Sequence, residues 1–256
     1  MNTENLQNNN SERNNDQNVY TDSISQWYDA IMEAGYYDYE RAAGGLAKAF
    51  KGRERILELG IGTGLLAEQM IKRGFKVTGV DFTEAMLGIA RNRLGNTAQL
   101  YEQNVTRLHL PETYEAAYSE GGIWYITRDK DGNIFLESHL TSYDDNVRAM
   151  QNVVNTLEPG GLLALGIQSV HADLKALPLK NGAVYSQKVS YRPPYIDKEY
   201  FVKQGEQILA HQRSKYMRLS DQERLHMLEE TGLVEIGIDQ GGQFVILQKI
   251  GAHSSK

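Results

Sequence analysis

The sequence predicts an α/β fold built on a parallel β-sheet with helices on both faces. From Arg55 onward, short apolar stretches alternate with segments of helical periodicity, and buried strands separated by helices are typical of parallel sheets. The first apolar stretch is followed directly by three glycines, Gly60, Gly62 and Gly64, as expected where a buried strand turns into a helix that binds a ligand.

The length and composition fit one α/β domain with additional segments, and they disfavour some classes of binding partner. The chain has 256 residues, 41% hydrophobic, and a formal net charge of −6. An acidic chain without Lys/Arg runs is poorly suited to nucleic acid. No apolar stretch approaches the roughly 20 residues of a membrane span, and there is no cysteine for disulfides or thiolate metal sites. We therefore expect a cytoplasmic protein without nucleic-acid or membrane partners.

The first 50 residues divide into two parts. Residues 1–18 contain eight Asn and two Gln, lack the basic and apolar regions of a signal peptide, and predict a disordered leader. Residues 19–50 are rich in aromatic side chains and alanine, with Ile24, Tyr28 and Ile31 at helical spacing. We expect these residues to form a helical lid ahead of the main sheet.

The main domain is predicted to span residues 51–250. Its expected buried strands are 55–60, 76–81, 99–105, 115–122 and 162–168, and its expected helices are 64–73, 84–94 and 142–157. In the second helix Leu87, Ala90 and Leu94 share one face, which is the face that should cover the sheet.

Three later segments depart from this alternation. Residues 123–140 alternate around Asp131-Gly132 and predict a hairpin, and residues at about 180–219 predict an antiparallel insert of about three strands. Ser220, followed by Glu223, forms a capping-box pattern that begins the last helix. Residues 233–250 then predict a closing hairpin with its turn near Gly241-Gly242.

The glycine loop does not suit a phosphate. A dinucleotide-binding loop would place its third glycine at position 65, which is Leu65, and Glu58 stands two residues before the first glycine. An acid there would repel a phosphate and suits a cationic ligand. Asp81 ends the next strand, where an acid accepts hydrogen bonds from ribose hydroxyls. A ribose, a positive charge and no phosphate together describe S-adenosylmethionine (SAM).

The chain resembles the class I SAM-dependent methyltransferases through four motifs in order. They are ILELGIGTG, VTGVDFTEAMLGIAR, the QNV segment and LEPGGLLAL, and they cover about residues 55–170. The resemblance implies a Rossmann-like, seven-stranded sheet, which the last helix and hairpin complete. The lid and the insert look most like small-molecule enzymes, such as the nucleotide-sugar amino N,N-dimethyltransferases and glycine N-methyltransferase-like enzymes.

The resemblance also implies which residues bind the cofactor. The first loop would hold the methionine moiety, Asp81 the ribose, and the residues after the second and third strands the adenine. Asn104 stands where the family usually has Asp, and Ser119 would open toward the substrate. The implied set is Glu58, Gly60, Gly62, Gly64, Asp81, Phe82, Met86, Asn104, Val105 and Ser119.

Methyl transfer needs alignment of donor and acceptor above all, and a base only if the acceptor is protonated. The candidate catalytic residues are His139, His171 and Tyr28, with Tyr28 as an aromatic cover for a sulfonium. Tyr125, Glu120, Glu137 and His211 are further candidate bases, and each histidine could instead be structural. No metal-binding pattern is present, and Asp144-Asp145 fits a helix start.

The predicted function is transfer of a methyl group from SAM to nitrogen or oxygen of a small molecule, by a monomer or homodimer. Methylation of carbon and binding of SAM without catalysis are the alternatives. A methyltransferase acting on RNA or protein is the rival among enzymes. RNA is disfavoured, because SEGGIWY replaces a base-methylation motif after the fourth strand and no basic stripe is present. The identity of the acceptor is not encoded in these motifs.

Overall fold

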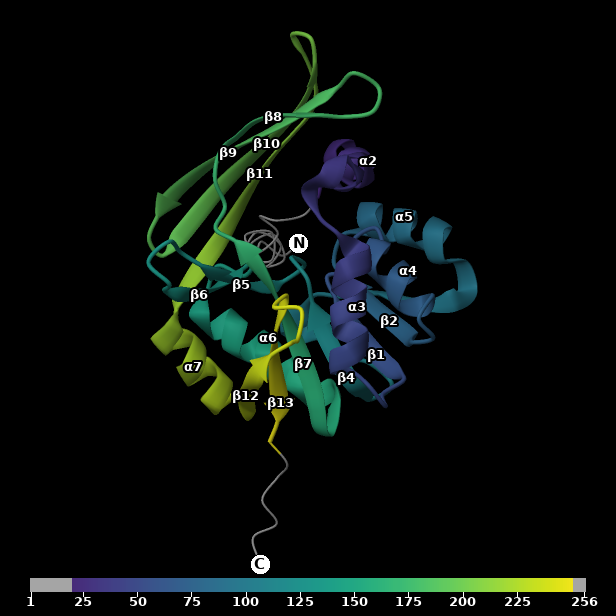
Figure 1. Cartoon of the computed structure of the whole chain (residues 1–256), viewed down its shortest axis with the longest axis vertical. Helices are drawn as coiled ribbons and strands as arrows, with labels where there is room; N and C mark the ends of the chain where they lie inside the picture. The colour runs from purple at the N-terminus through teal and green to yellow at the C-terminus, as the bar shows by residue number, and fades with distance from the viewer. Residues whose placement is uncertain (1–19, 251–256) are drawn as a thin grey trace, which may run out of the picture.

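The structure, a computed structural model, describes residues 20–250, so the predicted leader lies outside the described residues. Within this part of the chain, thirteen strands form one hydrogen-bonded network (Figure 1). The predicted α/β class with a large, mostly parallel sheet is confirmed. The expectation of seven strands falls short, because the antiparallel insert and the 123–140 hairpin hydrogen-bond to the same network instead of standing apart from it.

Seven strands form the mostly parallel part, in the order β3-β2-β1-β4-β7-β13-β12. Neighbours from β3 to β7 pair in parallel, whereas β13 pairs antiparallel with both β7 and β12. The strands are β1 (Arg55–Leu59), β2 (Lys76–Asp81), β3 (Ala98–Glu102), β4 (Tyr114–Ser119), β7 (Leu157–Ser169), β12 (Leu233–Ile238) and β13 (Phe244–Lys249).

Helices cover both faces of this sheet, as predicted for buried parallel strands (Figure 1). One face packs against α3 (Tyr39–Ala49), α4 (Leu65–Ile71) and α5 (Glu84–Leu94). The opposite face packs against α6 (Tyr143–Thr156) and α7 (Asp221–Glu230), the latter starting with the predicted capping box of Ser220 and Glu223. Short 3₁₀ turns follow α5 and β3: η2 (Gly95–Thr97) and η3 (Val105–Arg107).

The remaining six strands form an antiparallel extension that rises above the parallel sheet (Figure 1). Its order is β5-β6-β11-β10-β9-β8, and β5 joins it to the end of β7. The strands are β5 (Trp124–Arg128), β6 (Ile134–Ser138), β8 (Leu174–Pro178), β9 (Val184–Arg192), β10 (Tyr195–Gln204) and β11 (Gln207–Ser220).

The strand β8 lies before the predicted insert. Its sequence LKALP lacks β-branched and aromatic residues, so it carries little strand signal. It forms because it is an edge strand that pairs on one side with β9.

The N-terminal helix α2 (Asp22–Ile31) lies between the antiparallel extension and α5 (Figure 1). Ile24 and Ile31 pack with Tyr200 and Val202 of the extension. A π-helical turn, η1 (Met32–Tyr36), follows, and Gly35 breaks its helical geometry with a φ of 96° before α3 begins. The chain from α2 to α3 therefore crosses the edge of the sheet where the parallel strands end.

In the described part of the chain, no helix is long and apolar enough to cross a bilayer.

Asn146 stabilises this fold through buried hydrogen bonds, and this role can be tested. It is buried on α6, where its amide oxygen accepts from the Trp124 indole (2.7 Å) and its nitrogen donates to the carbonyls of Leu140 and Ser142. We expect Asn146→Ala to lower the free energy of unfolding by about 1–3 kcal/mol, because buried polar groups lose their partners. Urea unfolding measures this. Asn155→Ala, on the exposed side of the same helix, should stay within about 0.5 kcal/mol of wild type, and equal effects at both sites would contradict the assignment.

Candidate active site

The loops after β1 and β4 touch through their backbones. A Cβ on Gly122 would lie 2.4 Å from the Leu59 carbonyl oxygen, and one on Gly60 would lie 2.6 Å from the Gly122 Cα. Gly60 also has a φ of 69°, which strains any residue with a side chain. This contact requires glycine at both positions. Gly60 and Gly122 line one of the two pockets described below, and Gly121 lines the other.

The smaller pocket lies at the carboxyl ends of β1 and β2. Five predicted cofactor residues line it, together with residues after β3 and β4. The predicted members are Gly60, Asp81, Phe82, Asn104 and Val105, and the additional ones include Gln103, Gly122, Ile123, His139 and Leu140.

Asp81 is held in place by backbone donors. Its carboxylate accepts from the N–H groups of Gly62 and Thr83, each at 2.9 Å. Burial raises the pKa of Asp81, and these two hydrogen bonds oppose the rise. Gly62 therefore supports the site through its N–H and does not line the pocket.

Asn104 uses its amide oxygen locally. The oxygen accepts from the Thr106 N–H (2.9 Å) and the Thr106 hydroxyl (2.8 Å), which caps the turn η3. In the family that the sequence resembles, this position usually carries Asp, whose carboxylate can accept from a ligand. The structure leaves the amide N–H groups of Asn104 as the part that can contact one.

Four other predicted cofactor residues line neither pocket. Gly64 begins α4 with a φ of 81° and packs against Leu94, and Met86 is buried in α5. Ser119 is fully buried, and its hydroxyl accepts from the N–H groups of Ile123 and Trp124, which shapes the loop after β4. Glu58 is 5% exposed and accepts from the Tyr118 hydroxyl at 2.8 Å.

Three acids, the buried Glu58 and Asp81 and the partly buried Glu120, lie near one another at this edge of the sheet. Burial, together with the neighbouring carboxylates of Asp81 and Glu120, raises the pKa of Glu58 to about 8. Burial likewise raises the pKa of Glu120 to about 7, against hydrogen bonds from Gln168 and Tyr37. Within residues 20–250, none of the three acids has an ion-paired cation. The group therefore has no internal counter-charge, and a bound cation would stabilise its ionised forms.

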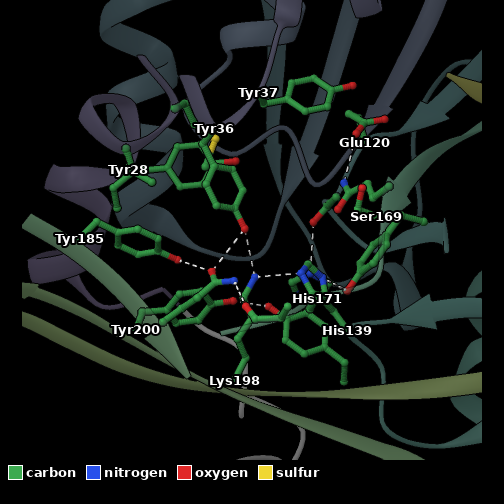
Figure 2. Close-up of a pocket in the computed structure, with 18 of the residues that line it drawn as sticks. Tyr28, Tyr36, Tyr37, Glu120, His139, Ser169, His171, Tyr185, Lys198 and Tyr200 are labelled. Atoms are coloured by element: carbon green, nitrogen blue, oxygen red, sulfur yellow. Dashed lines mark hydrogen bonds between the residues drawn. The ribbon is translucent and has the colours of Figure 1, made fainter. Parts of the chain in front are cut away.

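The larger pocket, of about 410 Å³, lies between α2, η1 and the antiparallel extension (Figure 2). Its wall is strongly aromatic, and the tyrosines come from the lid, from β5 and from the insert. They are Tyr20, Tyr28, Tyr36, Tyr37, Tyr39, Tyr125, Tyr185, Tyr200 and Tyr216. Glu120, His139, His171 and Lys198 add the ionisable groups.

His139 lines both pockets and stands where they meet. Its Nε2 lies 3.1 Å from the Gly121 carbonyl oxygen. Because a carbonyl can only accept, Nε2 carries the ring hydrogen. Burial lowers the pKa of His139 to about 4, so the ring is neutral at pH 7.

His171 follows β7 and belongs to a chain of polar contacts. Its Nε2 lies 2.8 Å from the Tyr125 hydroxyl, and its Nδ1 lies 3.2 Å from Lys198 Nζ. Burial, together with the charge of Lys198, lowers the pKa of His171 to about 3. Glu137 lies at 3.8 Å from Nε2 but is ion-paired to Arg218.

Tyr28 lines the larger pocket from α2, with its hydroxyl 3.4 Å from that of Tyr39. The next residue, Asp29, ties this helix to the glycine loop: it accepts from the Thr63 hydroxyl (2.7 Å) and pairs with Arg93. Arg93 in turn donates to the Thr63 carbonyl at 2.9 Å. The lid is therefore fastened to the loop that carries Gly60, Gly62 and Gly64.

Of the other candidate bases, Glu120 and Tyr125 line the larger pocket, whereas His211 does not. His211 is bound to Glu199 at 2.8 Å on the partly exposed surface of β11. No cluster of three or more potential metal ligands occurs in the described residues.

Lys198 is a pocket residue that the sequence analysis missed. On β10 the buried positions alternate, so Lys198 shares a face with Ile196, Tyr200 and Val202. That period of two, with one lysine among apolar residues, was a signal available in the sequence. Gly121 and Gly122 were also missed, because their role depends on contact with a distant loop.

The comparisons with known proteins agree with this geometry. Residues 56–161 match the family model described as a methyltransferase domain. A putative methyltransferase of Geobacillus sp. (strain WCH70) is 39% identical over 160 residues, which are 59% of this chain and 58% of that protein. The malonyl-[acyl-carrier protein] O-methyltransferase of Bacillus anthracis is 40% identical over 90 residues, 34% of each. Both matches span less than two thirds of the relative's length.

Two solved structures share the fold over nearly the whole chain. The CcbJ methyltransferase of Streptomyces caelestis gives a TM-score of 0.70 at 19% identity, covering 92% of this chain and all of that one. SAM-bound CalS10, an amino pentose methyltransferase from Micromonospora echinaspora, gives 0.67 at 18% identity, covering 91% and 98%. The protein therefore has the class I methyltransferase fold.

The neutral state of His139 is testable. We expect ring ¹⁵N NMR to show the tautomer protonated at Nε2 from pH 5 to 8, because burial and the Gly121 carbonyl disfavour the imidazolium. The signal is assigned by its loss in His139→Gln. A titration of this ring near pH 6.5 would contradict the buried contact.

Proposed function

We propose that the protein transfers a methyl group from SAM to nitrogen or oxygen of a small molecule. The smaller pocket takes the adenosine part of SAM, and the larger, tyrosine-lined pocket takes the acceptor. Both pockets lie at the carboxyl edge of the parallel strands, where ligands bind in this class of sheet. His139 lines both of them, so donor and acceptor meet beside it.

The observation that carries the proposal is the group of Glu58, Asp81 and Glu120. Burial raises the pKa of all three carboxyl groups, Asp81 and Glu120 also raise that of Glu58, and neutral groups are their only hydrogen-bond partners in residues 20–250. Such a group favours a cation, and SAM carries a sulfonium and an amino group. A phosphate at this position would be repelled.

The residues around the smaller pocket also fit a nucleoside. Asp81 lines this pocket, and backbone N–H groups hold its carboxylate in place. A carboxylate held in this way suits the hydroxyls of a ribose. Phe82 and Val105 supply apolar walls for a base, and the Asn104 amide offers donors to its ring nitrogens.

When bound, SAM supplies a methyl group already activated on sulfur. The protein's residues then have to align the acceptor and exclude water. The lid does this by closing the larger pocket with Tyr28, and the Asp29–Arg93 contact holds it against the glycine loop. The tyrosine faces near the reaction also favour a sulfonium.

We assign the proton-accepting role to Glu120 in preference to His139 or His171. Both rings are neutral, with pKa values far below 7, and the His139 Nε2 hydrogen is committed to Gly121. Glu120 lines the acceptor pocket, and its pKa of about 7 suits a base at neutral pH. A base of this kind favours N–H or O–H acceptors over carbon.

Asp81→Ala tests the cofactor site. We expect it to weaken binding of S-adenosylhomocysteine (SAH) and SAM by about 1–3 kcal/mol, roughly 5- to 150-fold, because two charge-assisted hydrogen bonds are lost. Calorimetry with SAH measures the change. Asp144→Ala, an exposed acid at the start of α6, is the control and should bind SAH like wild type. Unchanged affinity in a folded Asp81→Ala would refute the ribose assignment.

Glu120→Gln tests the chemistry, with SAH release from SAM measured over a panel of small aromatic amines and phenols. Wild-type kcat/KM should rise with pH up to about 7 or slightly below, since Glu120 accepts a proton only when ionised and a bound cation lowers its pKa. Glu120→Gln should lose about 100-fold or more in kcat together with this pH dependence. Glu112→Gln, an exposed acid, should lose neither. A wild-type pH profile in Glu120→Gln would exclude Glu120 as the base. If the wild-type protein binds SAH but turns over no acceptor, that result would favour SAM binding without catalysis.

A further inference from the structure

Lys198 is a buried cation at the wall of the acceptor pocket. It is 5% exposed, in the centre of β10, and its Nζ contacts the Tyr36 hydroxyl (3.3 Å) and His171 Nδ1 (3.2 Å). Figure 2 shows its amine among the rings that line the pocket, away from Glu120. A buried lysine normally has an acid as partner, because an isolated charge is costly in an apolar setting.

No acid in residues 20–250 forms an ion pair with Lys198. Glu137 is the carboxylate whose charge reaches it, but Arg218 is already ion-paired to Glu137. Glu137 therefore acts on Lys198 only at a distance, and Lys198 has no acid in direct contact among the described residues.

The hydrogen bonds around Lys198 also leave a donor unused. An ammonium has three N–H donors, and Tyr36 and His171 take two of them. The Tyr36 and Tyr185 hydroxyls both donate to the Gln187 oxygen, so these groups are committed to each other. The third N–H of Lys198 has no protein acceptor among the described residues, although Lys198 lines the cavity.

Aromatic rings enclose the same position. The Nζ of Lys198 lies 5.0 Å from the centroid of the Tyr200 ring and 5.9 Å from that of Tyr36. The rings shield the amine from water, which strengthens its attraction for an anion. They also offer flat apolar walls to the rest of a ligand.

We propose that the methyl acceptor is an aromatic carboxylate, and that Lys198 binds its carboxylate while the methyl-accepting group points toward Glu120 and His139. This inference rests on the proposed function. A single lysine matches a monoanion, whereas a dianionic phosphate would add a second charge near the buried acids Glu137 and Glu120. Burial lowers the pKa of Lys198 to about 7, and a bound carboxylate restores the charged form.

Binding of small probes to the SAH-loaded protein tests the proposal. The probes are benzoate, its neutral counterpart benzamide, and phenyl phosphate, with affinities measured by NMR titration. We expect wild type to bind benzoate about 10- to 100-fold more tightly than benzamide, and more tightly than phenyl phosphate. Lys198→Met should remove the preference for benzoate, and Lys198→Arg should retain part of it.

Lys188→Met is the matched control, because Lys188 is exposed on the neighbouring strand β9 and should leave the preference unchanged. Equal binding of benzoate and benzamide, binding of neither, tighter binding of phenyl phosphate, or a preference that survives Lys198→Met would each overturn the proposal. SAH calorimetry on the same samples separates this inference from the proposed function. If wild type does not bind SAH, the proposed function is contradicted. If wild type binds SAH but shows no preference for benzoate, only this inference is contradicted. Circular dichroism confirms that each variant is folded.

Discussion

The backbone contact between Gly60 and Gly122 is the constraint on which the site depends. It brings the loops after β1 and β4 within a distance that no side chain would permit. One pocket forms on the side of Asp81, the other on the side of Gly121, and His139 reaches both. The parallel strands supply the rigid support, because their carboxyl ends meet at one edge.

Acidic and basic side chains lie at different ends of the region formed by the two pockets. The acids Glu58, Asp81 and Glu120 gather at the end of the parallel sheet, and Lys198 projects from the insert. The two histidines between them are neutral because burial removes their charge. In the proposed function, the parallel sheet binds the cationic cofactor and the antiparallel extension selects the acceptor.

Local sequence signals predicted most of the elements. The strand–helix alternation from Arg55, the capping box at Ser220 and the hairpin around Asp131-Gly132 all occur as expected. These features are set by periodicity and turn chemistry within a few residues. The strand β8 was missed because it has little strand propensity of its own and forms by pairing with β9.

The sequence by itself determined the fold class, the glycine loop and the acid after β2, since each is written within one short segment. Tertiary structure decided which of these side chains face a cavity: it turned Ser119 and Met86 inward to packing roles and gave the Asn104 oxygen to Thr106. It also brought Lys198 to His171 and Gly122 to Gly60. Those contacts join residues far apart in the chain, and only the packing of the insert and the lid against the sheet fixes them.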